Sequence, residues 1–142
     1  MKKQPTVITG TEGYGDIHII GTKILSRSLK DAGFNVIPLG AGVVPERFIK
    51  VAQETDADAI LMSSLYGMAE LDLKGFKEKC LEAGLGNIIL YLGGHLSLGR
   101  HDYKEDETKF KEMGFDRVYP PEADIQAAIK DLWGDLKARG KA

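Results

Sequence analysis

Residues 58–67 read Asp-Ala-Ile-Leu-Met-Ser-Ser-Leu-Tyr-Gly, an apolar run of strand length that ends in small and hydroxyl-bearing residues. A continuous apolar run of this kind is typical of a strand that is buried on both faces of a sheet. Stretches of helix length, with apolar residues at helical spacing, precede and follow it. This alternation along the chain predicts an α/β fold with a parallel sheet.

The pattern predicts five strand–helix units in succession. Gly33, Gly84 and Gly114 follow three of the predicted helices and Pro45 opens another, as expected at helix ends and first turns. Five such units in 142 residues favour a flavodoxin-like, doubly wound five-stranded parallel sheet of order 2-1-3-4-5, with helices on both faces. We expect one domain over residues 1–142, with strands over 6–9, 35–39, 58–63, 87–92 and 117–119 and helices over 20–32, 46–55, 71–83, 105–113 and 123–136.

The composition is that of an ordinary globular protein, with 43% apolar residues, 28% charged residues and a net charge of −2. This charge does not favour a nucleic-acid or membrane-surface partner. Apolar runs such as 88–92 are too short to cross a bilayer, and no apolar signal core follows the N-terminal lysines. Because the single cysteine, Cys80, cannot form an internal disulfide, we expect a cytoplasmic protein.

Three loops rich in glycine and hydroxyl residues follow the first, third and fourth predicted strands, over residues 10–18, 63–67 and 93–99. In a doubly wound sheet, ligands bind outside the carboxyl ends of the strands, near the switch point between strands one and three. Glycines in these loops let a large ligand approach the backbone closely. The sequence therefore predicts a ligand site at the carboxyl edge of the sheet.

The first of these loops contains Asp16-x-His18-x-x-Gly21. A neutral imidazole is a good ligand for a transition metal, and a nearby carboxylate can accept the other ring N–H and fix the tautomer. One imidazole is too few for a structural zinc site, which needs about four ligands, but it suits a metal that a macrocycle already holds. Taken alone, a loop histidine is more often a solvated residue than a ligand, and Asp16 could instead cap the following helix.

The same motif, followed by Ser63-x-Leu65 and Gly93-Gly94, resembles in order and spacing the three-part signature of the cobalamin-binding domains of mutases and methionine synthase. The likeness is strongest to the family of small (sigma) subunits of glutamate mutase, also called methylaspartate mutase. Segments 63–67, 74–80 and 113–121 carry this further likeness, which runs over almost the whole chain.

The resemblance implies an adenosylcobalamin cofactor whose own benzimidazole has left the cobalt. His18 replaces that base as the metal ligand, with Asp16 as its partner, and no further catalytic residue is implied on this chain. The nucleotide tail enters a slot beside the sheet, which the serine and the paired glycines line. The cofactor-binding residues so implied are Gly15, Asp16, Ile17, His18, Ile19, Gly21, Ser63, Ser64, Leu65, Gly67, Gly93, Gly94, His95, Leu96, Ser97, Leu98, Gly99 and Tyr119.

The resemblance also implies an activity and a partner. The chain would be a subunit of an isomerase that converts L-glutamate to (2S,3S)-3-methylaspartate by radical rearrangement of the carbon skeleton. It would be inactive without a large barrel-type catalytic subunit, which binds most of the substrate, in a heterotetramer of two small and two large subunits.

Two alternatives remain open at this point. A corrinoid-binding subunit of another mutase, such as one acting on acyl-CoA, or of a methyl-transfer system would carry the same motif. A flavin-binding electron carrier could use residues 9–13 to cradle a phosphate, but that leaves Asp16 and His18 unexplained.

Other reactive or aromatic residues have ordinary interpretations. His95 either hydrogen-bonds the polar periphery of the cofactor or is a solvated loop residue. Cys80 lies on the apolar stripe of a predicted helix and is expected to be a small core residue. Trp133 is expected in the core or an interface, and the charged run 104–111 on a solvated helix face.

Overall fold

The computed structural model describes residues 4–11, 19–64, 73–94, 103–120 and 123–141. All strand pairs are parallel, and the sheet order is β2-β1-β3-β4-β5, as predicted for a flavodoxin-like fold. The elements in chain order are β1 (Thr6–Thr11), α1 (Ile19–Asp31), β2 (Asn35–Pro38), α2 (Pro45–Thr55), β3 (Ala59–Ser64), α4 (Phe76–Glu82), β4 (Ile89–Gly94), α5 (Tyr103–Glu112), β5 (Arg117–Tyr119) and α6 (Ile125–Ala138).

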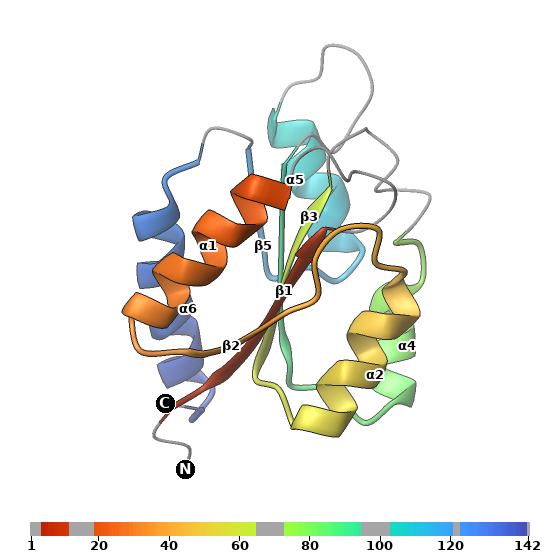
Figure 1. Cartoon of the computed structure of the whole chain (residues 1–142). Coiled ribbons are helices and arrows are strands. Elements are labelled where there is room, and N and C mark those ends of the chain that lie inside the picture. The colour runs from red at the N-terminus through yellow and green to blue at the C-terminus, as the bar shows by residue number, and fades with distance from the viewer. Residues whose placement is uncertain (1–3, 12–18, 65–72, 95–102, 121–122, 142) are drawn as a thin grey trace.

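Helices cover both faces of the sheet, with α1 and α6 on one side and α2 and α4 on the other (Figure 1). Each face has its own cluster of buried side chains, because successive residues of a strand point to opposite faces. On β4, Leu90 and Leu92 belong to the cluster under α2, α4 and α5. Ile89 and Tyr91 belong to the cluster under α1 and α6, and this second face carries the pocket described below.

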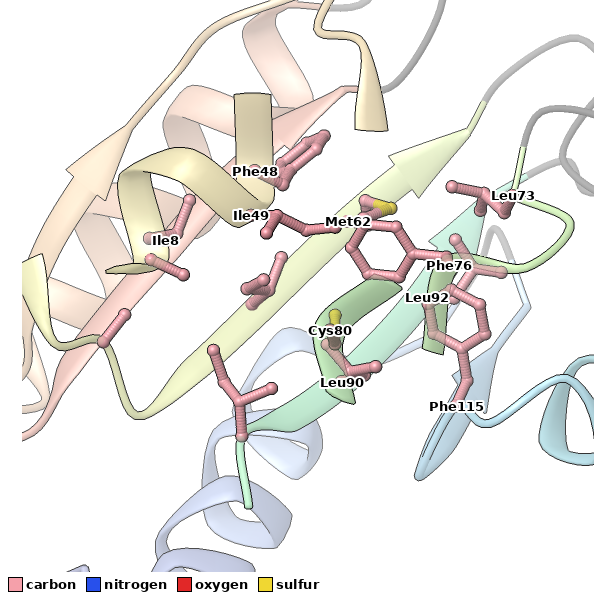
Figure 2. Close-up of a cluster of buried hydrophobic side chains, with 14 of the residues drawn as sticks. Ile8, Phe48, Ile49, Met62, Leu73, Phe76, Cys80, Leu90, Leu92 and Phe115 are labelled. Carbon is pink, nitrogen blue, oxygen red and sulfur yellow. The ribbon is translucent and has the colours of Figure 1, made fainter. Parts of the chain in front are cut away.

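The larger cluster packs Phe48 and Ile49 of α2 and Phe76 and Cys80 of α4 against the sheet (Figure 2). Cys80 is fully buried, and burial raises the pKa of its thiol to about 11. Since the thiolate is the nucleophilic form, this thiol is inert in the folded protein. The prediction of a small core residue is confirmed.

The helix predicted over 71–83 is shorter in the structure. α4 begins at Phe76, and Gly75 before it has a left-handed φ of 78°. Because glycine adopts this conformation at no steric cost, residues 73–75 form a turn instead of another helical turn. Leu73 is nevertheless fully buried. Its spacing from Phe76 is therefore that of residues on one face of a helix, although Leu73 itself lies in the turn before the helix.

Helix α1 rests on the sheet through Leu25 and Leu29. Leu29 is fully buried and Leu25 packs against the same cluster, whereas Ile24 is 53% exposed. A buried hydrogen bond of 2.8 Å joins Thr9 Oγ1 of β1 to Ser26 Oγ of α1. This bond ties the helix to the strand beside the pocket.

Two further predictions about side chains can be assessed. Trp133 stacks on Phe34 with ring centroids 4.3 Å apart, which confirms packing on the core of the α6 face. The charged run 104–111 lies largely at the surface, except that Asp106 and Phe110 are buried. Across the described ranges, no helix combines the length and apolar character that crossing a membrane requires.

Candidate functional site

The carboxyl ends of β1, β3 and β4 meet at one edge of the sheet. Thr11 pairs with Ser63, and Ser63 and Ser64 pair with Gly93 and Gly94 on the next strand. The structure therefore brings together these four predicted site residues of β3 and β4. The three predicted ligand loops continue from these strand ends in the sequence.

A pocket of about 110 Å³ lies at this edge, on the face covered by α1 and α6. It follows from the side-chain alternation along two paired strands. Leu61 and Tyr91 fill this face in mid-strand, whereas Ser63 and Gly93, two residues further on, leave it open. The lining residues are Leu25, Leu61, Met62, Ser63, Tyr91, Leu92, Gly93, Tyr119, Ala123, Asp124, Ile125 and Ala128.

Three of the predicted site residues, Ser63, Gly93 and Tyr119, line this pocket. Most of the other lining side chains are apolar, and an apolar cavity of about 150 Å³ is large enough to bind benzene. At about 110 Å³ this pocket is somewhat smaller than that cavity, and its lining is mostly apolar. Within the described part of the chain, the half-buried Ser63 side chain has no hydrogen-bond partner, so its hydroxyl is available to a ligand.

Sequence reasoning missed the contribution of the two helices to this pocket. Leu25 of α1 and Ile125 and Ala128 of α6 complete the lining, together with Ala123 just before α6, where the resemblance already implied a small residue near the nucleotide. The spacing of Ile125 and Ala128 already marks one face of a helix, and this signal could have identified them. The sequence does not show that this face lies over the carboxyl end of β4.

The two glycines that end β4 serve different purposes. A Cβ on Gly94 would lie 2.3 Å from the Ser64 carbonyl oxygen, and its φ is +104°, so the fold itself requires glycine there. A Cβ on Gly93 would make ordinary contacts of 3.6 Å with Tyr119. The fold can thus accept a side chain at position 93, and glycine there keeps space open in the pocket.

Two tyrosine rings in the pocket wall are anchored to α6. The rings of Tyr91 and Tyr119 lie 5.5 Å apart at an angle of 55°. Tyr91 donates a hydrogen bond to Asp135, and Tyr119 donates one of 2.8 Å to Asp131. Burial, followed by these hydrogen bonds, raises the pKa of both tyrosines, so both hydroxyls stay protonated. The Arg117 guanidinium donates to both oxygens of Asp135, at 2.8 and 3.1 Å, and lowers the pKa of that carboxyl.

The structure describes only some of the other predicted cofactor-binding residues. Ile19 and Gly21 fall in the first turns of α1. Among the side chains that the structure describes, no group of three or more His, Cys, Asp or Glu could hold a metal ion. The predicted residues that lie outside the described ones are Gly15, Asp16, Ile17, His18, Leu65, Gly67, His95, Leu96, Ser97, Leu98 and Gly99.

The sheet order and the apolar pocket at its carboxyl edge define a doubly wound α/β ligand-binding domain. The family model described as "B12 binding domain" matches residues 6–131. Glutamate mutase sigma subunits are similar to the chain, one from Carboxydothermus hydrogenoformans at 52% identity over 94% of this chain and 97% of the relative. Another, from Clostridium cochlearium, is 47% identical over 94% of this chain and 97% of the relative. The chain therefore belongs to the B12-binding domain family and, within it, to the glutamate mutase sigma subunits.

A solved structure supports the fold assignment. A cobalamin-binding protein from Desulfitobacterium hafniense superimposes with a TM-score of 0.71 at 20% identity, over 94% of this chain and 60% of that chain. At this identity the match bears on the fold alone. The family assignment, by contrast, favours a corrinoid over a flavin as the ligand of this domain.

Proposed function

We propose that this chain is the cobalamin-binding subunit of a glutamate mutase, and that the pocket between the sheet, α1 and α6 receives the nucleotide tail of the cofactor. The observation that carries this proposal is that Ser63 and Gly93, from two of the three parts of the sequence motif, line one pocket. The identity of 52% to a glutamate mutase sigma subunit supports the choice of this mutase.

The lining residues fit a heterocyclic base joined to a sugar phosphate. Apolar side chains surround the space, and the partly buried Tyr119 ring can pack against a planar base. Gly93 leaves room that a Cβ would fill, and Ser63 offers a hydroxyl. Moving the apolar part of a base from water into such a pocket is favourable by about 25 cal/mol per Å² buried.

We assign the cobalt ligand to His18 on the donor chemistry of the first loop. By sequence, His18 lies between Thr11, which ends β1 at the carboxyl edge of the sheet, and Ile19, which begins α1. A neutral imidazole would be a suitable ligand for a metal that a macrocycle already holds, and Asp16, as acceptor of the other ring N–H, would raise its basicity. The remaining contacts to the corrin or its tail are assigned to Gly15, Ile17, Ile19, Gly21, Ser64, Leu65, Gly67, Gly94, His95, Leu96, Ser97, Leu98, Gly99 and Tyr119.

In this assignment, this chain binds the cofactor and a second subunit binds the substrate. When bound, adenosylcobalamin supplies the radical chemistry of the rearrangement, and this chain binds it, orients it and removes its tail from water. Two of the arginines of this chain, Arg117 and Arg139, form ion pairs with Asp135 and Asp116, and the sigma subunits that it resembles are by name one part of a larger enzyme. We therefore place the substrate on a larger barrel-type subunit, in a cytoplasmic heterotetramer of two small and two large subunits.

The test of cofactor binding is a titration of the chain with hydroxocobalamin and adenosylcobalamin, followed by visible absorbance. We expect the spectrum of a corrinoid whose own base has left the metal. His18→Ala should sharply weaken binding and activity, and Asp16→Asn should have a smaller effect, because losing an orienting partner costs about 10–100-fold. Unchanged affinity and turnover in His18→Ala would reject the assignment.

The test of the mutase assignment is an activity assay on the chain with and without the large subunit. We expect glutamate to be converted to 3-methylaspartate only when both subunits and adenosylcobalamin are present. Activity of the chain alone, or turnover of an acyl-CoA substrate with the large subunit of another mutase, would contradict the assignment to glutamate mutase.

A further inference from the structure

A polar network joins α6 to strands β4 and β5 directly beside the pocket. Asp135 accepts hydrogen bonds from the buried Tyr91 hydroxyl and from Nε and Nη2 of Arg117. One helical turn earlier, Asp131 accepts a bond from Tyr119 and lies 3.8 Å from Nη1 of Arg117. One guanidinium therefore links both carboxylates, and the two carboxylates hold both tyrosines.

The rings of these two tyrosines belong to the pocket wall, whereas their hydroxyls belong to the network. Tyr91 is 1% exposed, so its hydroxyl has no access to bulk water as an alternative partner. Tyr119 is partly buried and tilts over Tyr91 at 55°. The orientation of both rings, and thus the width of the pocket, depends on where α6 holds its carboxylates.

The charges in the network favour this arrangement. The hydrogen bond from Arg117 is the main cause of the lowered pKa of Asp135, so the carboxylate is ionised and can only accept. Both Tyr91 and Tyr119 remain protonated and can donate. Hydrogen bonds with an ionised partner are about twice as strong as neutral ones, so the rings are held firmly before any ligand arrives.

We propose that Asp135 is a positioning residue for the nucleotide tail, because it holds Tyr91 directly and, through Arg117 and Asp131, Tyr119, in the orientation that keeps the pocket open. This inference rests on the proposed function. Asp135 lines no part of the pocket itself and acts through the rings. Binding sites gain affinity when the side chains that form them are locked by a further set of hydrogen bonds.

The test compares two corrinoids on the full chain: hydroxocobalamin, which carries the nucleotide tail, and cobinamide, which lacks it. Affinities are measured by absorbance titration. Asp135→Asn presents an amide that cannot accept from Tyr91 and from both nitrogens of Arg117. We expect this variant to bind hydroxocobalamin about tenfold more weakly, because losing a residue that orients a binding group costs about 10–100-fold in affinity. It should bind cobinamide as tightly as the unsubstituted chain does.

Arg139→Gln is the matched control. Arg139 lies just after α6 and anchors it through Asp116, at 2.6 Å, and through the carbonyls of Asn87 and Ile88, which lie before β4 at the other edge of the sheet. Its loss removes one ion pair at the far end of α6 and leaves the hydrogen bonds of Asp135 and Asp131 to Tyr91, Arg117 and Tyr119 in place. We expect both corrinoid affinities to be unchanged in this variant.

Tyr91→Phe keeps the ring and removes only its bond to Asp135, and it provides a second variant if Asp135→Asn does not fold. It too should weaken binding of hydroxocobalamin but not of cobinamide. Equal affinities of either variant and the unsubstituted chain for hydroxocobalamin, or an equal loss for both corrinoids, would overturn the role of Asp135. An unsubstituted chain that binds both corrinoids equally would instead show that the pocket does not hold the tail, which contradicts the proposed function.

Discussion

Replacing Gly93 by alanine should separate the stability of the fold from the binding of the cofactor. The added Cβ would meet Tyr119 at 3.6 Å, an ordinary contact, and Gly93 does not have a left-handed φ. Glycine within a strand is less stable than alanine by roughly 0.5–1 kcal/mol, so the variant should be as stable as the parent or slightly more stable.

The same methyl group should impair binding, because Gly93 is on the same face of β4 as Tyr91 and lines the pocket. In a pocket of about 110 Å³, one extra carbon would take space from the cofactor base that we propose to bind there. Inserting a methyl group into a well-packed site costs about 1–3 kcal/mol. The expected loss of cobalamin affinity is therefore roughly 5- to 150-fold.

The assay pairs urea unfolding with absorbance titration by hydroxocobalamin. Gly134→Ala is the control, since Gly134 lies on α6 and its added Cβ would have no heavy atom within 4 Å. It should gain up to about 1 kcal/mol of stability and keep its affinity for cobalamin. A Gly93→Ala protein of normal stability that binds cobalamin as tightly as the parent would refute the placement of the tail in this pocket.

Three further predictions concern stability and reactivity. Gly94→Ala should lower the free energy of unfolding, measured in urea, by at least about 2 kcal/mol. The left-handed φ of 104° costs a residue with a side chain about 1–2 kcal/mol, and the added Cβ would lie 2.3 Å from the Ser64 oxygen. A smaller loss would mean that β4 can shift. Cys80 should react with a disulfide reagent only after denaturation, because burial raises its pKa to about 11, and rapid labelling of the native protein would contradict this. Asp135 has a lowered pKa in the folded protein, so its contribution to stability is present above the unfolded pKa of about 3.9 and is lost as the pH falls through the folded pKa. The difference in unfolding free energy between the parent and Asp135→Asn should therefore shrink between about pH 7 and pH 3. A constant difference would contradict the lowered pKa of Asp135.

Much of the fold can be predicted from local sequence patterns, because parallel strands buried on both faces read as apolar runs. The run at 59–62 and its counterparts gave all five strands and, with the intervening helices, the sheet order. The start of α4 was predicted too early. Leu73 is buried at helical spacing from Phe76, and this apolar spacing outweighed the glycine at position 75.

The candidate site was predictable only where it lies at strand ends. Ser63 and Gly93 follow apolar strands, and the topology places such residues at one edge. The anchoring of Tyr91 by Asp135 joins residues 44 positions apart, and it depends on how α6 packs across β4 and β5. A single sequence carries no local pattern for a pairing of that kind.

Ligation of a bound corrinoid's metal by a histidine of this chain can be tested by electron paramagnetic resonance of the Co(II) form of cobalamin. An axial nitrogen splits each line of this spectrum, into three for ¹⁴N and into two for ¹⁵N. With the protein labelled only at histidine by ¹⁵N, and the vitamin left unlabelled, we expect doublets. Triplets that persist in the labelled complex would show that the vitamin's own base is still bound to the metal, and would rule out His18 as its ligand.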